Sequence, residues 1–191
     1  AVANENTTAL EIGDEPMQFH KKYPDIIVAV GEERLFAIPQ IISQYPHIQT
    51  IILDDAFQHR WVKCGLNILV TDFNNLYYND SLLPIGSLRE SANGAKRADI
   101  IIVSKTPERS SAVEIKVILK DINPLAHQQV FFSYLKYGEL YSINNSENKI
   151  STLNELFRYR VISFAGIANA EPMTNYLKEF SEGLKHLPFG D

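Results

Sequence analysis

Four short and nearly continuous apolar runs constrain the fold of this chain more than any other feature of its sequence. They span residues 26–30, 50–53, 67–71 and 99–103, and a fifth run follows at 161–165. Apolar residues at consecutive positions are typical of strands that are covered on both faces. The gap between the first two runs holds one helical pattern, so the sequence predicts an α/β fold with a mostly parallel sheet and flanking helices.

The remaining elements follow from the spacing of apolar residues between and after these runs. Helical spacing covers residues 32–45, 110–121 and 172–180, and Pro39 should kink or shorten the first of these helices. Residues 128–143 alternate aromatic with polar side chains and predict a hairpin that turns at 136–139. We therefore expect a core α/β part over residues 1–125 and a smaller C-terminal α/β part over residues 126–191.

Charge and composition exclude several classes of protein. The chain has 18 basic and 23 acidic side chains and a formal net charge of -5, so it lacks the positive field that attracts nucleic acid. No apolar run approaches the ~20 residues that a transmembrane helix needs. The one cysteine, Cys64, cannot form an internal disulfide. We expect a soluble protein of a reducing compartment with no nucleic-acid partner.

Two adjacent carboxylates, Asp54 and Asp55, follow the second apolar run. Ligands bind α/β sheets at the carboxyl ends of strands, and hard oxygen ligands suit Mg²⁺ in phosphoryl transfer. The residue types fit a plainer alternative equally well, in which Asp54 caps a helix or turn and Asp55 faces water. Gln58 and His59 lie three and four residues after Asp55, so one helical turn would bring the three side chains to the same face.

Two further segments carry candidate residues. Residues 13–16 read Gly-Asp-Glu-Pro, which predicts a helix start and places Asp14 at the amino end, where it could also act as a base. The loop at 82–90 ends in Arg89 and Glu90. The planar guanidinium of Arg89 could hold a phosphate, although a surface salt bridge would explain the pair as well.

Acidic residues and a lysine at strand ends also invite comparison with a receiver-type signalling module. Asp72 follows the third apolar run, and Lys105 follows the fourth. Asp55 and Asp72 are only 17 residues apart, which leaves no room for the helix, strand and helix that a receiver places between its acids. The receiver is therefore the weaker alternative.

Four motifs in order resemble those of the tetraacyldisaccharide 4'-kinase family. They read GDEP at 13–16, DDAFQHR at 54–60, LPIGSLRE at 83–90 and FAGI at 164–167, and they span nearly the whole chain. The resemblance implies a P-loop NTPase-like core. It also implies ATP- and Mg²⁺-dependent phosphorylation of the 4'-hydroxyl of an acylated glucosamine disaccharide phosphate in lipid A biosynthesis. The family acts at the cytoplasmic face of the Gram-negative inner membrane, to which it binds peripherally.

The resemblance also implies roles for single residues. Asp14 would be the catalytic base, and Asp54 and Asp55 would hold Mg²⁺ directly or through water. Gln58 and His59 would organise the active site. Arg89 and Glu90 would lie beside the nucleotide.

Three features depart from the pattern of the family. Ala56 stands where the family more usually has glycine, which concerns only the local turn. No GxxxxGK(S/T) segment occurs in the 191 residues, and the chain reaches Asp191 before the histidines of the family. We therefore expect an incomplete P-loop NTPase-like core and a fragment that is inactive by itself. A non-catalytic domain that binds phosphate-sugars or lipids is the alternative function.

Overall fold

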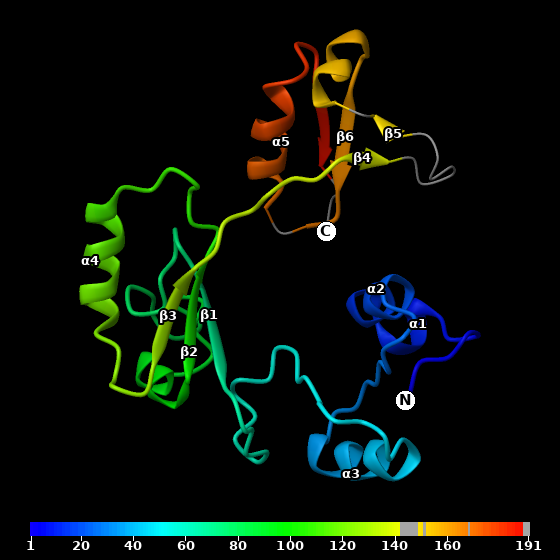
Figure 1. Cartoon of the computed structure of the whole chain (residues 1–191), viewed down its shortest axis with the longest axis vertical. Coiled ribbons are helices and arrows are strands. Elements are labelled where there is room, and N and C mark those ends of the chain that lie inside the picture. Colours follow the sequence, from blue (N-terminus) through cyan, green and yellow to red (C-terminus); the bar gives the residue numbers. More distant parts are fainter. Residues whose placement is uncertain (142–148, 151, 168, 189–191) are drawn as a thin grey trace. The chain divides into compact units, whose positions relative to one another are not determined.

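The computed structural model describes residues 1–141, 149–150, 152–167 and 169–188, which form two compact units. The α/β class and the mostly parallel pairing are those expected from the sequence (Figure 1). The first unit, Ala1–Tyr134, contains α1 (Ala9–Ile12), α2 (Asp14–Lys22), α3 (Arg34–Gln44), β1 (Ile68–Asp72), the 3-10 helix η1 (Ala92–Arg97), β2 (Ile100–Ser104), α4 (Ala112–Ile122) and β3 (Gln129–Phe132). The second unit, Leu135–Asp191, contains β4 (Leu140–Tyr141), β5 (Lys149–Ile150), η2 (Leu153–Arg158), β6 (Ile162–Ala165), α5 (Glu171–Lys178) and β7 (Lys185–Pro188).

A parallel sheet in the order β1-β2-β3 forms the centre of the first unit. Its core lies on one face, where Ile101 and Val103 of β2 are almost completely buried. Ile118 and Ile122 of α4 pack into the same cluster. On the opposite face, the side chains of Val70 and Phe131 are 61% and 51% exposed. The described residues therefore bury one face of this sheet far more than the other.

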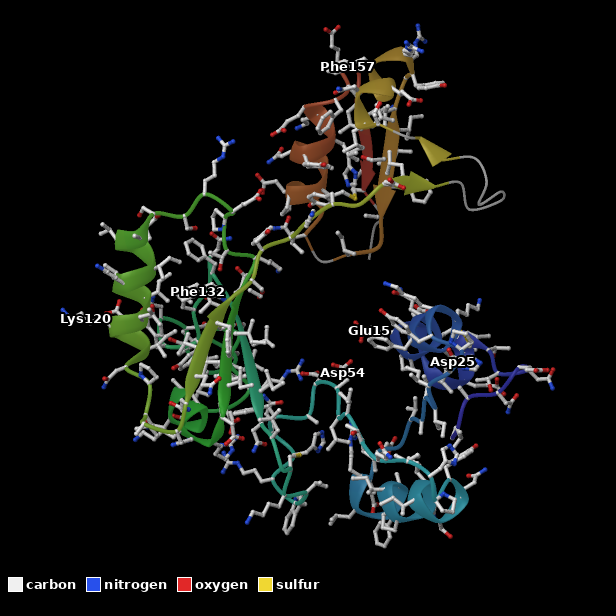
Figure 2. The ribbon with its side chains drawn as sticks, in the orientation of Figure 1. Glu15, Asp25, Asp54, Lys120, Phe132 and Phe157 are labelled. Carbon is white, nitrogen blue, oxygen red and sulfur yellow. The ribbon has the colours of Figure 1, made fainter. Side chains whose placement is uncertain are left out.

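Helix α4 shows why this part of the sequence folds as predicted. Ser111 and Glu114 form a capping box that satisfies backbone N–H groups at its start, and Asn123 ends it in the left-handed conformation. Lys120 points away from the sheet, whereas Phe132 packs against the cluster under the helix (Figure 2). The capping residues and the apolar face thus both favour a helix here, and α4 confirms the helix predicted from the spacing at 110–121.

Two of the predicted strands are absent from the described structure. Residues 26–30 make only an isolated bridge between Val2 and Ala29, and residues 50–53 form no strand. Ile52 is 88% exposed. A parallel strand depends on hydrogen bonds to neighbouring strands, and neither segment has a sheet neighbour within the described residues. The prediction of strands at these two positions is therefore wrong for this structure.

The predicted hairpin at 128–143 is also wrong. Residues 129–132 form β3, which pairs parallel with β2, and residues 140–141 form β4, which pairs antiparallel with β5. Alternating side chains identify a strand with one covered face, but they do not say which neighbour it takes. Residues 142–148, which include the end of the predicted hairpin, lie outside the described residues.

The predicted strand at 161–165 is observed as β6, which pairs parallel with β7. The helices expected at 32–45 and 172–180 are α3 and α5, and Pro39 lies inside α3. Among the helices that the structure describes, none combines the length and apolar character of a membrane span.

Candidate active site

The loop Leu82–Glu90, here called the proline loop, is held in shape by Asp80. The Asp80 carboxylate accepts hydrogen bonds from the N–H of Ser81 at 2.7 Å and from the N–H and hydroxyl of Ser87. These bonds lower the pKa of Asp80, the Ser87 hydroxyl contributing most. A Cβ on Gly86 would collide with the same carboxylate. These contacts therefore fix the conformation of the part of the loop that directly precedes Arg89 and Glu90.

The segment Asp54–Arg60, here called the acidic segment, is a series of turns rather than a helix. The N–H of His59 donates to the carbonyl of Ala56 at 2.9 Å, and Asp55 has a φ of 45°. The expected helical turn through Asp55, Gln58 and His59 is thus wrong, because left-handed backbone at Asp55 is incompatible with a helix. A non-glycine residue in this conformation is strained and needs surrounding contacts to hold it.

One such contact joins the acidic segment to the proline loop. Nη1 of Arg89 lies 2.6 Å from Oδ2 of Asp55, although 34 residues separate the two in sequence. The hydrogen bond and the attraction to Asp55 raise the pKa of Arg89. Both side chains are more than half exposed, so the pair itself adds little to stability. Its importance lies in bringing two of the sequence motifs to one place.

Glu90 makes the second connection and lies between two arginines. Its Oε2 accepts from Arg60 and its Oε1 from Arg97, each at 2.6 Å. Burial by itself would raise the pKa of Glu90, but the hydrogen bonds from Arg97 and Arg60 outweigh it and hold the pKa below its usual value. The Glu90 side chain is only 16% exposed, so it is better shielded from water than Asp55, which is 68% exposed.

A shallow pocket of about 60 Å³ lies beside this network, and Gln58, Arg89 and Glu90 are among its lining residues. That volume holds about four water molecules, far less than a nucleotide needs. The structure therefore brings Gln58, Asp55, Arg89 and Glu90 to adjacent positions, as the motifs suggest.

Three other candidate residues have no recorded polar contact of their side chains within the described parts of the chain. Asp54 and His59 are exposed on the acidic segment, and Figure 2 shows Asp54 on the irregular chain between α3 and β1. Asp14 is the first residue of α2 and is exposed. The helix start expected at residues 13–16 is confirmed, with Gly13 in the capping position at a φ of 93°.

The carboxyl ends of the sheet strands carry a separate ion pair. Nζ of Lys105, after β2, lies 2.7 Å from Oδ2 of Asp72, the last residue of β1. Burial tends to raise the pKa of Asp72, but the hydrogen bond from Lys105 and the N–H of Asn74 lower it overall. Lys105 also has a positive φ, of 55°.

The sequence motifs assign no role to Arg60 or Arg97. Arg60 could have been found, because it closes the DDAFQHR motif. Arg97 follows Lys96 just before a buried strand and carries no local signal. In the described ranges, no three His, Cys, Asp or Glu side chains gather into a metal-binding group.

Comparison with known proteins identifies relatives along the whole length of the chain. The model of the family described as Tetraacyldisaccharide-1-P 4'-kinase matches residues 1–191. A tetraacyldisaccharide 4'-kinase of Bacteroides thetaiotaomicron is 41% identical over 198 residues, which cover 100% of this chain and 52% of that protein. The enzyme of the same name from Flavobacterium johnsoniae is 43% identical over 178 residues, covering 93% of this chain and 51% of that protein.

A third relative, the tetraacyldisaccharide 4'-kinase of Parabacteroides distasonis, is 40% identical over 197 residues, covering 100% of this chain and 52% of its own length. The chain therefore spans about half the length of the curated relatives that it matches. No solved structure matches it.

Proposed function

The chain belongs to the tetraacyldisaccharide-1-P 4'-kinase family, and on this premise we propose that it carries part of the active site of a lipid A kinase. The full enzyme would transfer the γ-phosphoryl group of ATP to the 4'-hydroxyl of tetraacyldisaccharide 1-phosphate. The contact between Asp55 and Arg89 is the observation that carries the proposal. It joins two motifs whose residue types suit the metal and the charged phosphates of such a reaction.

Asp54 and Asp55 would hold Mg²⁺. Mg²⁺ in phosphoryl-transfer sites keeps several water ligands and needs only one or two carboxylates from the protein. Asp55 fits this requirement, because Arg89 engages only its Oδ2 and the side chain is 68% exposed. Asp54 is also exposed and offers two further oxygens. When bound, Mg²⁺ would neutralise charge on the phosphate oxygens of ATP.

Arg89 would supply positive charge beside the metal. A guanidinium is effectively always protonated in proteins, and the hydrogen bond to Asp55 raises the pKa of Arg89 further. A guanidinium held by one carboxylate oxygen keeps other N–H groups free to donate to a phosphate. Glu90 would keep this corner of the site in place through its two arginines.

The other family roles concern Asp14, Gln58 and His59, of which Gln58 lines the pocket beside Arg89 and Glu90. Asp14 would orient the 4'-hydroxyl or accept its proton, and Gln58 and His59 would position the reacting groups. Asp14 is exposed at the first position of α2, so its carboxylate is accessible to a hydroxyl group. A peripheral location at the cytoplasmic face of the inner membrane would give the enzyme access to its acylated substrate.

The chain contains its own reporter for a test of the metal site. Trp61 is its single tryptophan, lies six residues after Asp55, and is 85% exposed. We expect titration with Mg²⁺, alone and with a non-hydrolysable ATP analogue, to give a saturable change in Trp61 fluorescence. Asp55→Ala should abolish this change, because it removes a metal ligand.

Asp25→Ala is the matched control, since Asp25 is exposed and lies outside both motifs (Figure 2). It should titrate as the unmodified chain does. An unchanged Mg²⁺ response in Asp55→Ala would defeat the metal-site proposal and favour a non-catalytic domain that binds phosphate-sugars.

A further inference from the structure

Arg97 lies outside the four motifs and makes hydrogen bonds to two of them. It ends η1, and the next residue, Ala98, is completely buried. The side-chain amide of Gln128 donates to the carbonyls of Ala95 and Ala98, each at 2.8 Å, and so ties η1 to the start of β3. Arg97 therefore lies on an element that is packed and hydrogen-bonded to the core.

The guanidinium of Arg97 makes three contacts at once. Its Nη2 donates to Oε1 of Glu90 at 2.6 Å and to the carbonyl of Phe57 at 3.0 Å. Its Cζ lies 4.7 Å from the centre of the Phe57 ring, within range of a cation–π interaction. Phe57 belongs to the acidic segment and also packs against the core cluster. One side chain thus contacts both motifs.

These contacts hold the acidic segment from two sides. Asp55, two residues before Phe57, is bonded to Arg89, and Arg60, three residues after Phe57, is bonded to Glu90. Because the left-handed backbone at Asp55 is strained, it depends on such contacts. Loss of Arg97 would remove the contact at the centre of the segment and one of the two partners of Glu90.

Gly94 gives independent support for a packed connection. It is buried, and a Cβ at this position would lie 2.9 Å from Cδ of Glu90 and 3.0 Å from Nη1 of Arg97. The Glu90–Arg97 pair therefore packs directly against the backbone of η1 at Gly94. A surface ion pair that formed by chance would not need a glycine beneath it.

We propose that Arg97 is a positioning residue of the active site, which fixes the carboxylate of Asp55 by holding Phe57 and Glu90. This inference rests on the proposed kinase function for its effect on catalysis, but the structural coupling does not. Arg97 itself would touch neither substrate nor metal. Lysine would not replace it, because an ammonium group lacks the planar fork with which a guanidinium can lie over an aromatic ring and still donate to two acceptors.

The first experiment uses the chain as it is and needs no activity. Amide hydrogen exchange of residues 54–60 is compared in the unmodified chain, Arg97→Met, Arg97→Lys and the control Lys96→Met. Lys96 is the exposed neighbour of Arg97. We expect both Arg97 variants to speed exchange at His59, whose N–H closes the turn onto Ala56, while Lys96→Met leaves it unchanged.

The second experiment measures kinetics in a full-length kinase that carries this sequence. Arg97→Lys should lower kcat by about 10- to 100-fold, the range that is typical when the groups that orient a metal ligand are disturbed. The KM for ATP should stay within about twofold and the melting temperature within a few degrees, since the binding surface and the core are intact. Lys96→Met should match the unmodified enzyme in all three.

The two experiments separate the possible failures. Unchanged exchange at residues 54–60 in both Arg97 variants would overturn the inference, as would an unchanged kcat in an active enzyme. A fall in activity that only follows the loss of folded protein would also overturn it. If the unmodified full-length protein has no kinase activity, the proposed function fails, and the exchange measurement alone decides whether Arg97 holds the acidic segment.

Discussion

The ion pairs of Glu90 should contribute to the free energy of unfolding, and this contribution can be measured through its dependence on pH. The two arginines hold the pKa of Glu90 below the usual value in the folded state, so folding favours the ionised form. A lowered folded pKa contributes stability that is complete above the unfolded pKa, about 4.3. That contribution is lost as the pH falls through the lower, folded value.

We therefore expect Glu90→Gln to lower the free energy of unfolding by about 1–2 kcal/mol at pH 7, allowing for the exposure of Arg60. The difference should persist down to about pH 5 and shrink as the pH falls below about 4.3. It should vanish only below the lower, folded pKa, where Glu90 is neutral in both states. Urea denaturation of both proteins between pH 7.5 and 3.5 measures it. Glu108→Gln, at an exposed site, should show a small and flat difference. A gap that widens toward low pH would contradict the assignment.

At the scale of single residues, the sequence shows which candidate residues are present and in what order, but not which side chains contact one another. The motifs suggest that Asp55 and Arg89 share a site, and the structure pairs them. The sequence shows no sign that Glu90 forms an ion pair with Arg97, because that pair depends on where η1 packs against the core. The roles of the seven candidate residues remain proposals that the Mg²⁺ titration and the kinetics address.

At the scale of elements, the two faces of the parallel sheet differ enough to be compared by mutation. Val103 on β2 is fully buried under α4, whereas Val70 on β1 is 61% exposed. Val103→Ala should cost about 2–3 kcal/mol of unfolding free energy, because it removes buried methyl groups and leaves a cavity. Val70→Ala should cost less than about 1 kcal/mol, mainly through its lower strand preference.

Both variants make the same chemical change on neighbouring strands, so each controls for the other. Urea or thermal unfolding measured by circular dichroism gives the two values. Equal losses would mean that the exposed face of β1 is covered in solution, and the described arrangement of this sheet would then be incomplete.

The elements that the sequence predicts well are those in which several local signals agree. Helix α4 has an apolar face, a capping box and a left-handed cap, and β2 is an apolar run with strand neighbours on both sides. Residues 26–30 and 50–53 have only the apolar run. Without a partner strand, that signal does not settle whether backbone hydrogen bonds form. The neighbour of β3 likewise depends on tertiary pairing, which alternation cannot show.

At the scale of the whole molecule, the chain holds the acidic and arginine groups of the proposed site in its first unit. The FAGI motif lies in the second unit and ends outside β6. The chain spans about half of its curated relatives, and its 191 residues contain no GxxxxGK(S/T) segment. In P-loop kinases the backbone and lysine of that segment hold the β- and γ-phosphates. The groups described here could bind metal, but they do not include this cradle.

We therefore expect the 191-residue chain to show no turnover when it is given Mg²⁺, ATP and tetraacyldisaccharide 1-phosphate. Positioning of the phosphates accounts for most of the rate enhancement in phosphoryl transfer, so metal ligands alone cannot replace it. Formation of the bisphosphorylated product is the readout, with the full-length kinase of Bacteroides thetaiotaomicron as the positive control. Activity that Asp55→Asn removes would contradict this expectation, because it would show that the site is already complete. Activity that survives in Asp55→Asn and disappears after a second purification step would instead come from a contaminating kinase, whereas activity that persists after that step would also contradict the expectation.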